Sequence, residues 1–209
     1  SIATVGSGTS DTKTIVGSGI SCTLLAISGS ILTKVDDLVV VDSTVNINEL
    51  AITSISSSEA ILCYPSPSST ICNHLRVSAG TLTKGADLVF NDYHLLSGAS
   101  TSSYPSVVKL TSSEALICYN IGCIQGCTCN HLTVSGTTLT KGAALQVKSH
   151  YTYYVVVAAL SASEATVCYM ATYIDGTFDD DGVCNHLSVS GTTLTKGTDL
   201  RLFGGLHLD

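Results

Sequence analysis

Histidine and cysteine recur in this chain at spacings that could bind a metal ion or haem. Three histidines stand two residues after a cysteine, and three more lie 19 to 21 residues further along. Imidazole ligates zinc, copper and iron, so a pair in each repeat suggests a transition-metal or haem site. The candidate ligands are His74, His94, His131, His150, His186 and His207.

Covalent haem attachment places the histidine directly after the second cysteine of its motif. An asparagine intervenes in all three copies here, at Asn73, Asn130 and Asn185. A zinc site would also need free thiolates, which disulfides remove. We therefore favour a structural role, in which the Asn-His pairs supply hydrogen bonds to loops, and keep metal or haem as the alternative.

An acidic loop near the C-terminus offers oxygen ligands for calcium. Asp175, Asp179 and Asp181 stand close to the alternate spacing of a calcium loop, and Gly182 supplies a turn residue. The acidic residue that closes such a loop is missing, because the chain continues directly into Val183. We interpret the segment as a solvated acidic tip, with calcium binding as the alternative.

Nine cysteines indicate an oxidising environment, so we expect an extracellular or cell-surface protein. Three pairs bracket loops of variable length between segments of constant pattern, which predicts a disulfide across each hairpin. A fourth pair lies inside one of these loops, and one cysteine is left over, either unpaired or bonded to another chain. The predicted disulfides are Cys63–Cys72, Cys118–Cys129, Cys168–Cys184 and Cys123–Cys127, with Cys22 left over.

Four internal repeats position these residues. The same twelve-residue spacing from Cys to Lys recurs four times, and the motif Ser-Glu-Ala-x-x-Cys-Tyr precedes the last three copies. Successive copies are 50 to 57 residues apart. The copies are Cys22–Lys34, Cys72–Lys84, Cys129–Lys141 and Cys184–Lys196, and the preceding motifs are Ser58–Tyr64, Ser113–Tyr119 and Ser163–Tyr169.

Apolar and polar residues alternate with period two in every repeat, and β-branched residues are abundant, which predicts strands and hairpins. One unit of this size buries too little surface to be stable alone, so neighbouring units must share a core. We predict an all-β fold of tandem hairpin repeats, stacked as small sandwich-like modules or as a broad solenoid. The expected parts are an N-terminal extension (1–21), an incomplete first repeat (22–56) and three further repeats (57–110, 111–160 and 161–209).

Composition excludes several classes of function. The net charge of −7 leaves no basic surface for a nucleic acid. The longest apolar run, residues 153–160, is too short to span a membrane. The sequence contains no Gly-x-Ser-x-Gly, phosphate-binding glycine loop or His-Glu-x-x-His motif, so we do not expect an enzyme.

The repeats favour a structural subunit of an extracellular filament that binds copies of itself. In this hypothesis residues 1–21 donate a strand to the last repeat of a neighbouring copy, because unpaired sheet edges recruit strands. The alternative is a secreted adhesin or lectin-like module that binds a surface glycan or host-cell ligand with its variable hairpin loops. A third hypothesis is a filament that carries metal or haem on paired histidines.

Overall fold

A computed structural model shows that the protein is built from β-strands. It describes residues 2–5, 12–18, 21–28, 30–40, 50–66, 69–90, 104–120, 126–149, 152–171 and 181–203. Within these ranges, no helix is long and apolar enough to cross a membrane.

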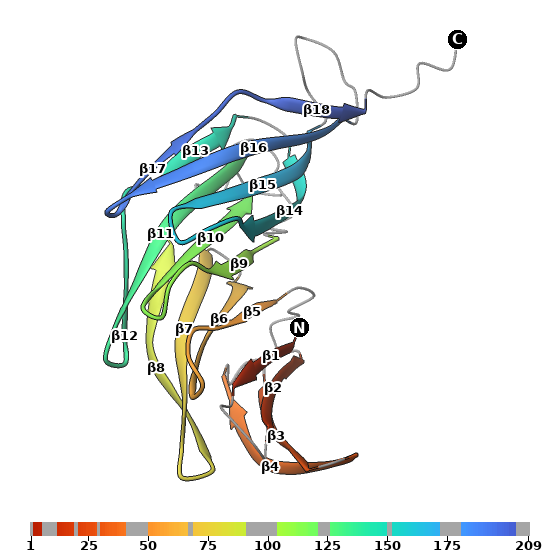
Figure 1. Ribbon diagram of the computed structural model, residues 1–209, viewed down its shortest axis with the longest axis vertical. Coiled ribbons are helices and arrows are strands. Elements are labelled where there is room, and N and C mark those ends of the chain that lie inside the picture. Colours follow the sequence, from red (N-terminus) through yellow and green to blue (C-terminus); the bar gives the residue numbers. More distant parts are fainter. Residues whose placement is uncertain are drawn as a thin grey trace.

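The strands form four antiparallel sheets that follow one another along the chain (Figure 1). Sheet 1 contains β1 (Ile2–Val5), β2 (Thr12–Ser18), β3 (Ser21–Ser28) and β4 (Ile31–Val39). Sheet 2 contains β5 (Ala51–Ser54), β6 (Glu59–Ser66), β7 (Ser69–Ser78) and β8 (Thr81–Phe90). Sheet 3 contains β9 (Ser106–Lys109), β10 (Glu114–Asn120), β11 (Cys127–Ser135), β12 (Thr138–Lys141) and β13 (Leu145–Lys148). Sheet 4 contains β14 (Thr152–Ala159), β15 (Glu164–Ala171), β16 (Asp181–Ser190), β17 (Thr193–Lys196) and β18 (Leu200–Phe203).

The sheets divide the chain at points that differ from the sequence repeats. Strands β1 and β2, within the expected N-terminal extension, belong to sheet 1, where β2 pairs with β3 from Thr12↔Ile27 to Ser18↔Ser21. These strands complete the first repeat, which lacks the Ser-Glu-Ala strand of the others. The segment expected to pair with another copy therefore forms strands within its own chain.

Each sheet packs face to face on the next, in the order of the chain (Figure 1). We call the face that carries the disulfide in sheets 2–4 the rear face, and the opposite one the front face. At each of the three junctions, the rear face of one sheet contacts the front face of the next. Rear-face residues at the junctions include Leu24 (sheet 1), Ile61 (sheet 2) and Leu116 (sheet 3), and front-face residues include Leu62 (sheet 2), Ile117 (sheet 3) and Val167 (sheet 4). The core is therefore divided into three layers between sheets, as expected for stacked modules.

Three disulfides lie across the central hairpins, as the sequence predicts. They join Cys63 to Cys72, Cys118 to Cys129, and Cys168 to Cys184. Each pair is directly opposite in the ladder, with the two Cα atoms 4.1 Å apart. In the chain-entropy model, closing loops of this size stabilises each hairpin by about 3 kcal/mol.

Glycine allows the turn of one sheet to approach the sheet before it. A methyl group on Gly85 would overlap the carbonyl oxygen of Thr137, which lies in the turn between β11 and β12. Gly142 meets the carbonyl oxygen of Thr192 in the same way, one sheet further on. The Lys-Gly of the repeat therefore marks the point where the next sheet docks.

Candidate functional site

A glutamate and a histidine lie side by side on the rear faces of sheets 2, 3 and 4. In each case the glutamate begins the second strand of the sheet, and the histidine lies in the third. The distances from histidine Nε2 to glutamate Oε1 are 3.6 Å for His74–Glu59, 3.6 Å for His131–Glu114 and 3.7 Å for His186–Glu164. The Glu-His pair recurs because both residues belong to the repeated sequence motif.

The first two of these histidines are buried beneath the next sheet. Their side chains are 1% (His74) and 0% (His131) exposed, and neither ring has a hydrogen-bond partner. Burial lowers the pKa of both imidazoles and outweighs the opposing effect of the glutamates. Both are therefore neutral at pH 7, and their position between sheets gives them a packing role.

The metal candidates do not assemble into a ligand set in the described part of the chain. Within it, no three His, Cys, Asp or Glu residues gather closely enough to hold a metal ion. His74, His131 and His186 belong to different sheets, and His94, His150 and His207 lie outside the described residues.

Of the three candidate calcium ligands, the structure describes Asp181, at the start of β16. Its buried carboxylate lies 3.6 Å from Nε of Arg201, which already balances its charge. Asp175 and Asp179 lie outside the described residues.

Among the cysteines that the structure describes, Cys22 and Cys127 are free thiols inside the stack. Cys22 lies in the layer between sheets 1 and 2, where burial raises its pKa to about 11. Cys127, which the sequence predicts in a disulfide with Cys123, is a free thiol between sheets 3 and 4, and burial raises its pKa as well. Cys127 points into this apolar layer because it shares the rear face with Cys129; Cys123 lies outside the described residues.

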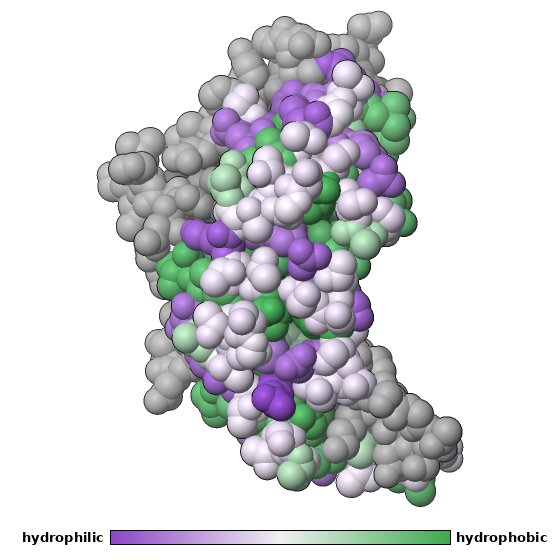
Figure 2. All heavy atoms as spheres, turned by 60° about the vertical axis from the view of Figure 1, so that its left-hand side comes forward, coloured by the Kyte–Doolittle hydropathy of each residue, from purple (hydrophilic) through white to green (hydrophobic). Residues whose placement is uncertain are grey.

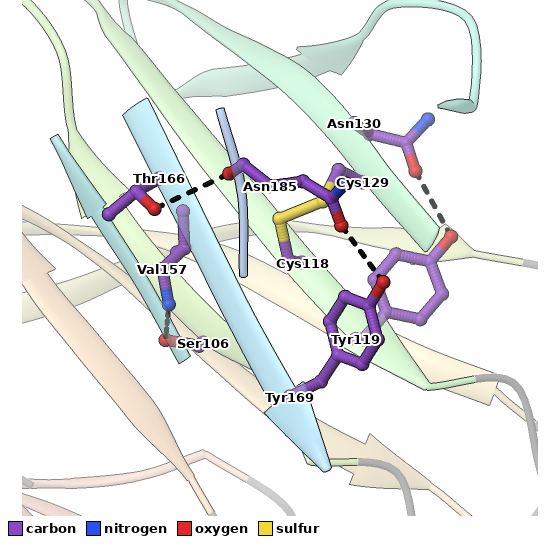
Figure 3. Close-up of a disulfide and its surroundings, with 9 residues drawn as sticks. All are labelled: Ser106, Cys118, Tyr119, Cys129, Asn130, Val157, Thr166, Tyr169 and Asn185. Atoms are coloured by element: carbon purple, nitrogen blue, oxygen red, sulfur yellow. Dashed lines mark hydrogen bonds between the residues drawn. A yellow bond between two sulfur atoms is a disulfide. The ribbon is translucent and has the colours of Figure 1, made fainter. Parts of the chain in front are cut away.

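The asparagine of each Asn-His pair ties the repeat together through hydrogen bonds. Tyr119 donates its hydroxyl to Oδ1 of Asn130 at 3.0 Å, and Asn130 donates to the carbonyl of Gly142 at 3.1 Å. Tyr169 and Asn185 repeat the first bond at 2.8 Å, one sheet away (Figure 3). The recurring Tyr and Asn therefore act as scaffold. This agrees with the hydrogen-bonding role that we expect of the asparagines, whereas the rings of His74 and His131 have no hydrogen-bond partner.

Two tyrosines form an aromatic pair where sheets 3 and 4 meet. The ring of Tyr104, just before β9, lies 5.3 Å from the ring of Tyr154 in β14, with the planes tilted by 50°. Tyr154 is 62% exposed. Tyr154 lies in a bulge between Tyr153 and Val156 and has a left-handed backbone angle (φ 54°).

A buried asparagine fixes the two strands that carry this pair. Asn120, the last residue of β10, accepts a hydrogen bond from the backbone N–H of Tyr104 at 2.7 Å. Its side-chain amide donates to the carbonyl of Thr152, the first residue of β14, at 3.1 Å. The tyrosine pair is thus anchored to both sheets.

The pair lies at the end of the sheets from which the variable hairpin connections leave. Asn120 pairs with Cys127 at the end of the β10–β11 hairpin, and Ala171 pairs with both Thr152 and Asp181 at the end of β15. We call this end of sheets 3 and 4 the loop end. The connections themselves, residues 121–125 and 172–180, lie outside the described residues.

The sequence analysis does not single out this pair, because the two tyrosines come from different repeats and meet only where sheets 3 and 4 pack together. The one available signal was the cluster of tyrosines at 151, 153 and 154 in an otherwise apolar run. Strict alternation would place Tyr154 and Val156 on one face, but gives no indication of the bulge or of Tyr104 as a partner.

The side of the stack drawn in Figure 2 mixes hydrophilic, neutral and hydrophobic residues. Among its coloured residues, no kind gathers into one large patch.

The comparisons with known proteins identify a shared fold. No protein-family model matches the chain, and no curated protein matches it. A triple arginine-to-alanine mutant of AofleA from Arthrobotrys oligospora superposes on 98% of this chain, with a TM-score of 0.56 and 13% identity. The SapL1 lectin, solved in complex with alpha-methyl fucoside, superposes on 96% of it, with a TM-score of 0.51 and 10% identity.

This chain spans 57% of the length of the AofleA chain and 64% of the SapL1 chain. At these identities the likeness concerns the fold and assigns no residue.

Proposed function

We propose that the protein is an extracellular, lectin-like module that binds carbohydrate. The observation that carries this proposal is the likeness of almost the whole chain to the fold of SapL1, a lectin solved with a bound fucoside. Three disulfides in described hairpins favour an extracellular location. The proposal corresponds to the second hypothesis from the sequence. It is favoured over strand donation because β1 and β2, the segment expected to pair with another copy, pair within their own chain.

We place the carbohydrate at the loop end, on the pair of Tyr104 and Tyr154. A sugar ring presents a face of C–H groups that packs on an aromatic ring, while its hydroxyls bond to polar groups nearby. Tyrosine suits this role because it offers a large contact area with few rotatable bonds and a hydroxyl at its tip. Asn120 hydrogen-bonds to the backbone near both tyrosines, so binding of a ligand costs little conformational entropy there.

The variable hairpins would supply selectivity. The disulfide-bonded cysteines are 9, 11 and 16 residues apart in successive sheets, whereas the strands around them keep their pattern. Variation confined to loops on a constant scaffold is typical of binding proteins. We therefore infer that the loop end recognises the ligand and that the stacked sheets position it.

A glycan array tests the proposal. The labelled protein should bind a restricted set of glycans, and alpha-methyl fucoside is included as one soluble competitor. Tyr154→Ala should weaken binding to the best glycan about tenfold, since an aromatic contact contributes about 1 to 1.5 kcal/mol. Thr140→Ala is the control: Thr140 is exposed and lies in β12, at the end of sheet 3 opposite the loop end.

Binding to no glycan on the array would refute the lectin proposal. Selective binding that Tyr154→Ala leaves unchanged would refute the placement of the sugar at Tyr154.

A further inference from the structure

Among the described residues, the rear face of sheet 4 is exposed at positions that are buried in sheets 2 and 3. Ile55, Leu110 and Leu160 are equivalent, since each donates its backbone N–H to the glutamate that begins the next strand. Ile55 is fully buried and Leu110 is partly buried, whereas Leu160 is 60% exposed. In the part of the chain that the structure describes, the rear face of sheet 4 is thus an exposed apolar surface.

Other rear-face positions follow the same progression. Phe90 and Val147 are 0% and 1% exposed, whereas Leu202, at the equivalent position of the last strand, is 57% exposed. The side chains of His74 and His131 are covered, whereas that of His186 is 47% exposed. Among described residues, Gly197 has no turn from a following sheet above it, unlike Gly85 and Gly142.

The first sheet presents the complementary face. Leu82, Leu139 and Leu194 occupy the same position after the turn in sheets 2, 3 and 4, and they are 3%, 5% and 6% exposed. Each packs against the rear face of the preceding sheet. Leu32 is their equivalent in sheet 1, and it is 65% exposed.

We propose that a second copy of this chain docks the front face of its sheet 1 onto the rear face of sheet 4. This contact would repeat, between copies, the junction that the chain builds three times within itself. The shapes of the two faces support docking of a second copy. Gly197 leaves room for a turn, as Gly85 and Gly142 do within the chain. Ser30 occupies the position in the turn of sheet 1 that Thr137 and Thr192 occupy in the turns of sheets 3 and 4.

Polar groups support the same occupant. Lys141 and Lys196 each reach back to a backbone carbonyl of the preceding sheet, at Val89 (3.2 Å) and Val147 (2.8 Å). Lys34 occupies the corresponding position of sheet 1, and its side chain is 62% exposed beside Asp37. In the proposed contact it would reach the last strand of the neighbouring copy.

The two surfaces differ from each other, so the contact is heterologous. Such contacts close into a ring or continue as an open chain of copies, depending on the rotation between neighbours. This inference is independent of sugar binding, although an assembly would multiply any sugar sites and raise avidity.

The test is analytical ultracentrifugation of the full chain over a range of concentrations. The unmodified protein should associate as concentration rises. Leu32→Asp blocks the front face and Leu202→Asp blocks the rear face, and each alone should remain monomeric. Both leucines are already exposed, so these variants should keep the fold, which circular dichroism verifies.

Mixing the two variants provides the decisive result. One variant keeps an intact rear face and the other an intact front face, so an equimolar mixture should form heterodimers and nothing larger. Gly197→Leu should also prevent association, and Thr140→Asp, at an exposed position of sheet 3, should associate like the unmodified protein. The proposal is overturned if the unmodified protein stays monomeric at millimolar concentration, if either variant associates alone, or if the mixture stays monomeric.

Discussion

Two glycines at the same position of the repeat should respond in opposite ways to the same substitution. A methyl group at Gly142 would overlap the carbonyl oxygen of Thr192, so Gly142→Ala must push sheet 4 away from sheet 3. Gly197 has no following sheet above it among the described residues. A methyl group there would meet only His186, at ordinary contact distances of 3.6 and 3.7 Å.

The expected changes in the free energy of unfolding follow from these contacts. Overpacking a tight junction costs about 1 to 3 kcal/mol, so Gly142→Ala should lower the free energy of unfolding by that amount. Gly197→Ala removes freedom from the unfolded chain without a clash, and should raise it by about 0.4 to 1 kcal/mol. In a protein of this size, 1 kcal/mol corresponds to a shift of roughly 2 to 4 °C in Tm.

Reversible urea unfolding of both variants, in dilute protein to avoid association, measures the difference. Gly85→Ala serves as a second test, because Gly85 meets Thr137 in the same way. Equal free energies of unfolding for Gly142→Ala and Gly197→Ala would refute the docking role that we assign to the Lys-Gly position.

Two further predictions concern buried groups. Cys22 and Cys127 should resist iodoacetamide in the folded protein and react after unfolding, because both thiols are buried and their pKa values are raised. Mass spectrometry of the labelled peptides measures this. Rapid labelling of the folded chain would contradict the prediction. The free energy of unfolding should fall as the pH drops below about 6.5, because burial lowers the pKa of His74 and His131 in the folded state and only the unfolded chain takes up their protons. Replacing both histidines by Asn should make the free energy of unfolding nearly independent of pH between pH 7 and 5. The loss of stability caused by the lowered pKa of Asp87 and Asp199 should begin only near pH 4. An unchanged pH dependence in the double variant would show that these histidines do not cause the effect.

The hairpins could be predicted because their signals are local. Period-two alternation, the turn residues and the cysteine spacing all belong to adjacent strands, so the all-β class and the three hairpin disulfides follow from the sequence. The stacking of repeats also follows, since a single unit is too small to bury a core.

Other features depend on contacts that the pattern does not encode. Strands β1 and β2 lack the repeat motif, and only their pairing with β3 shows that they complete sheet 1. The expected partner of Cys127 was its neighbour in sequence, but Cys127 shares the rear face with Cys129 and lies in the layer between sheets 3 and 4. Tyr154 lies in a bulge and contacts Tyr104 of another sheet, and strict alternation predicts neither feature.

Backbone amide NMR of the 15N-labelled chain, titrated with the glycan that binds best on the array, tests the central claim most directly. If sugar binds at the loop end, shift changes should concentrate on Tyr104, Asn120, Tyr154 and their neighbours, and they should saturate with the affinity measured independently. Tyr154→Ala should reduce them, and Thr140→Ala should not. Shift changes confined to another part of the stack, or none at saturating sugar, would contradict it.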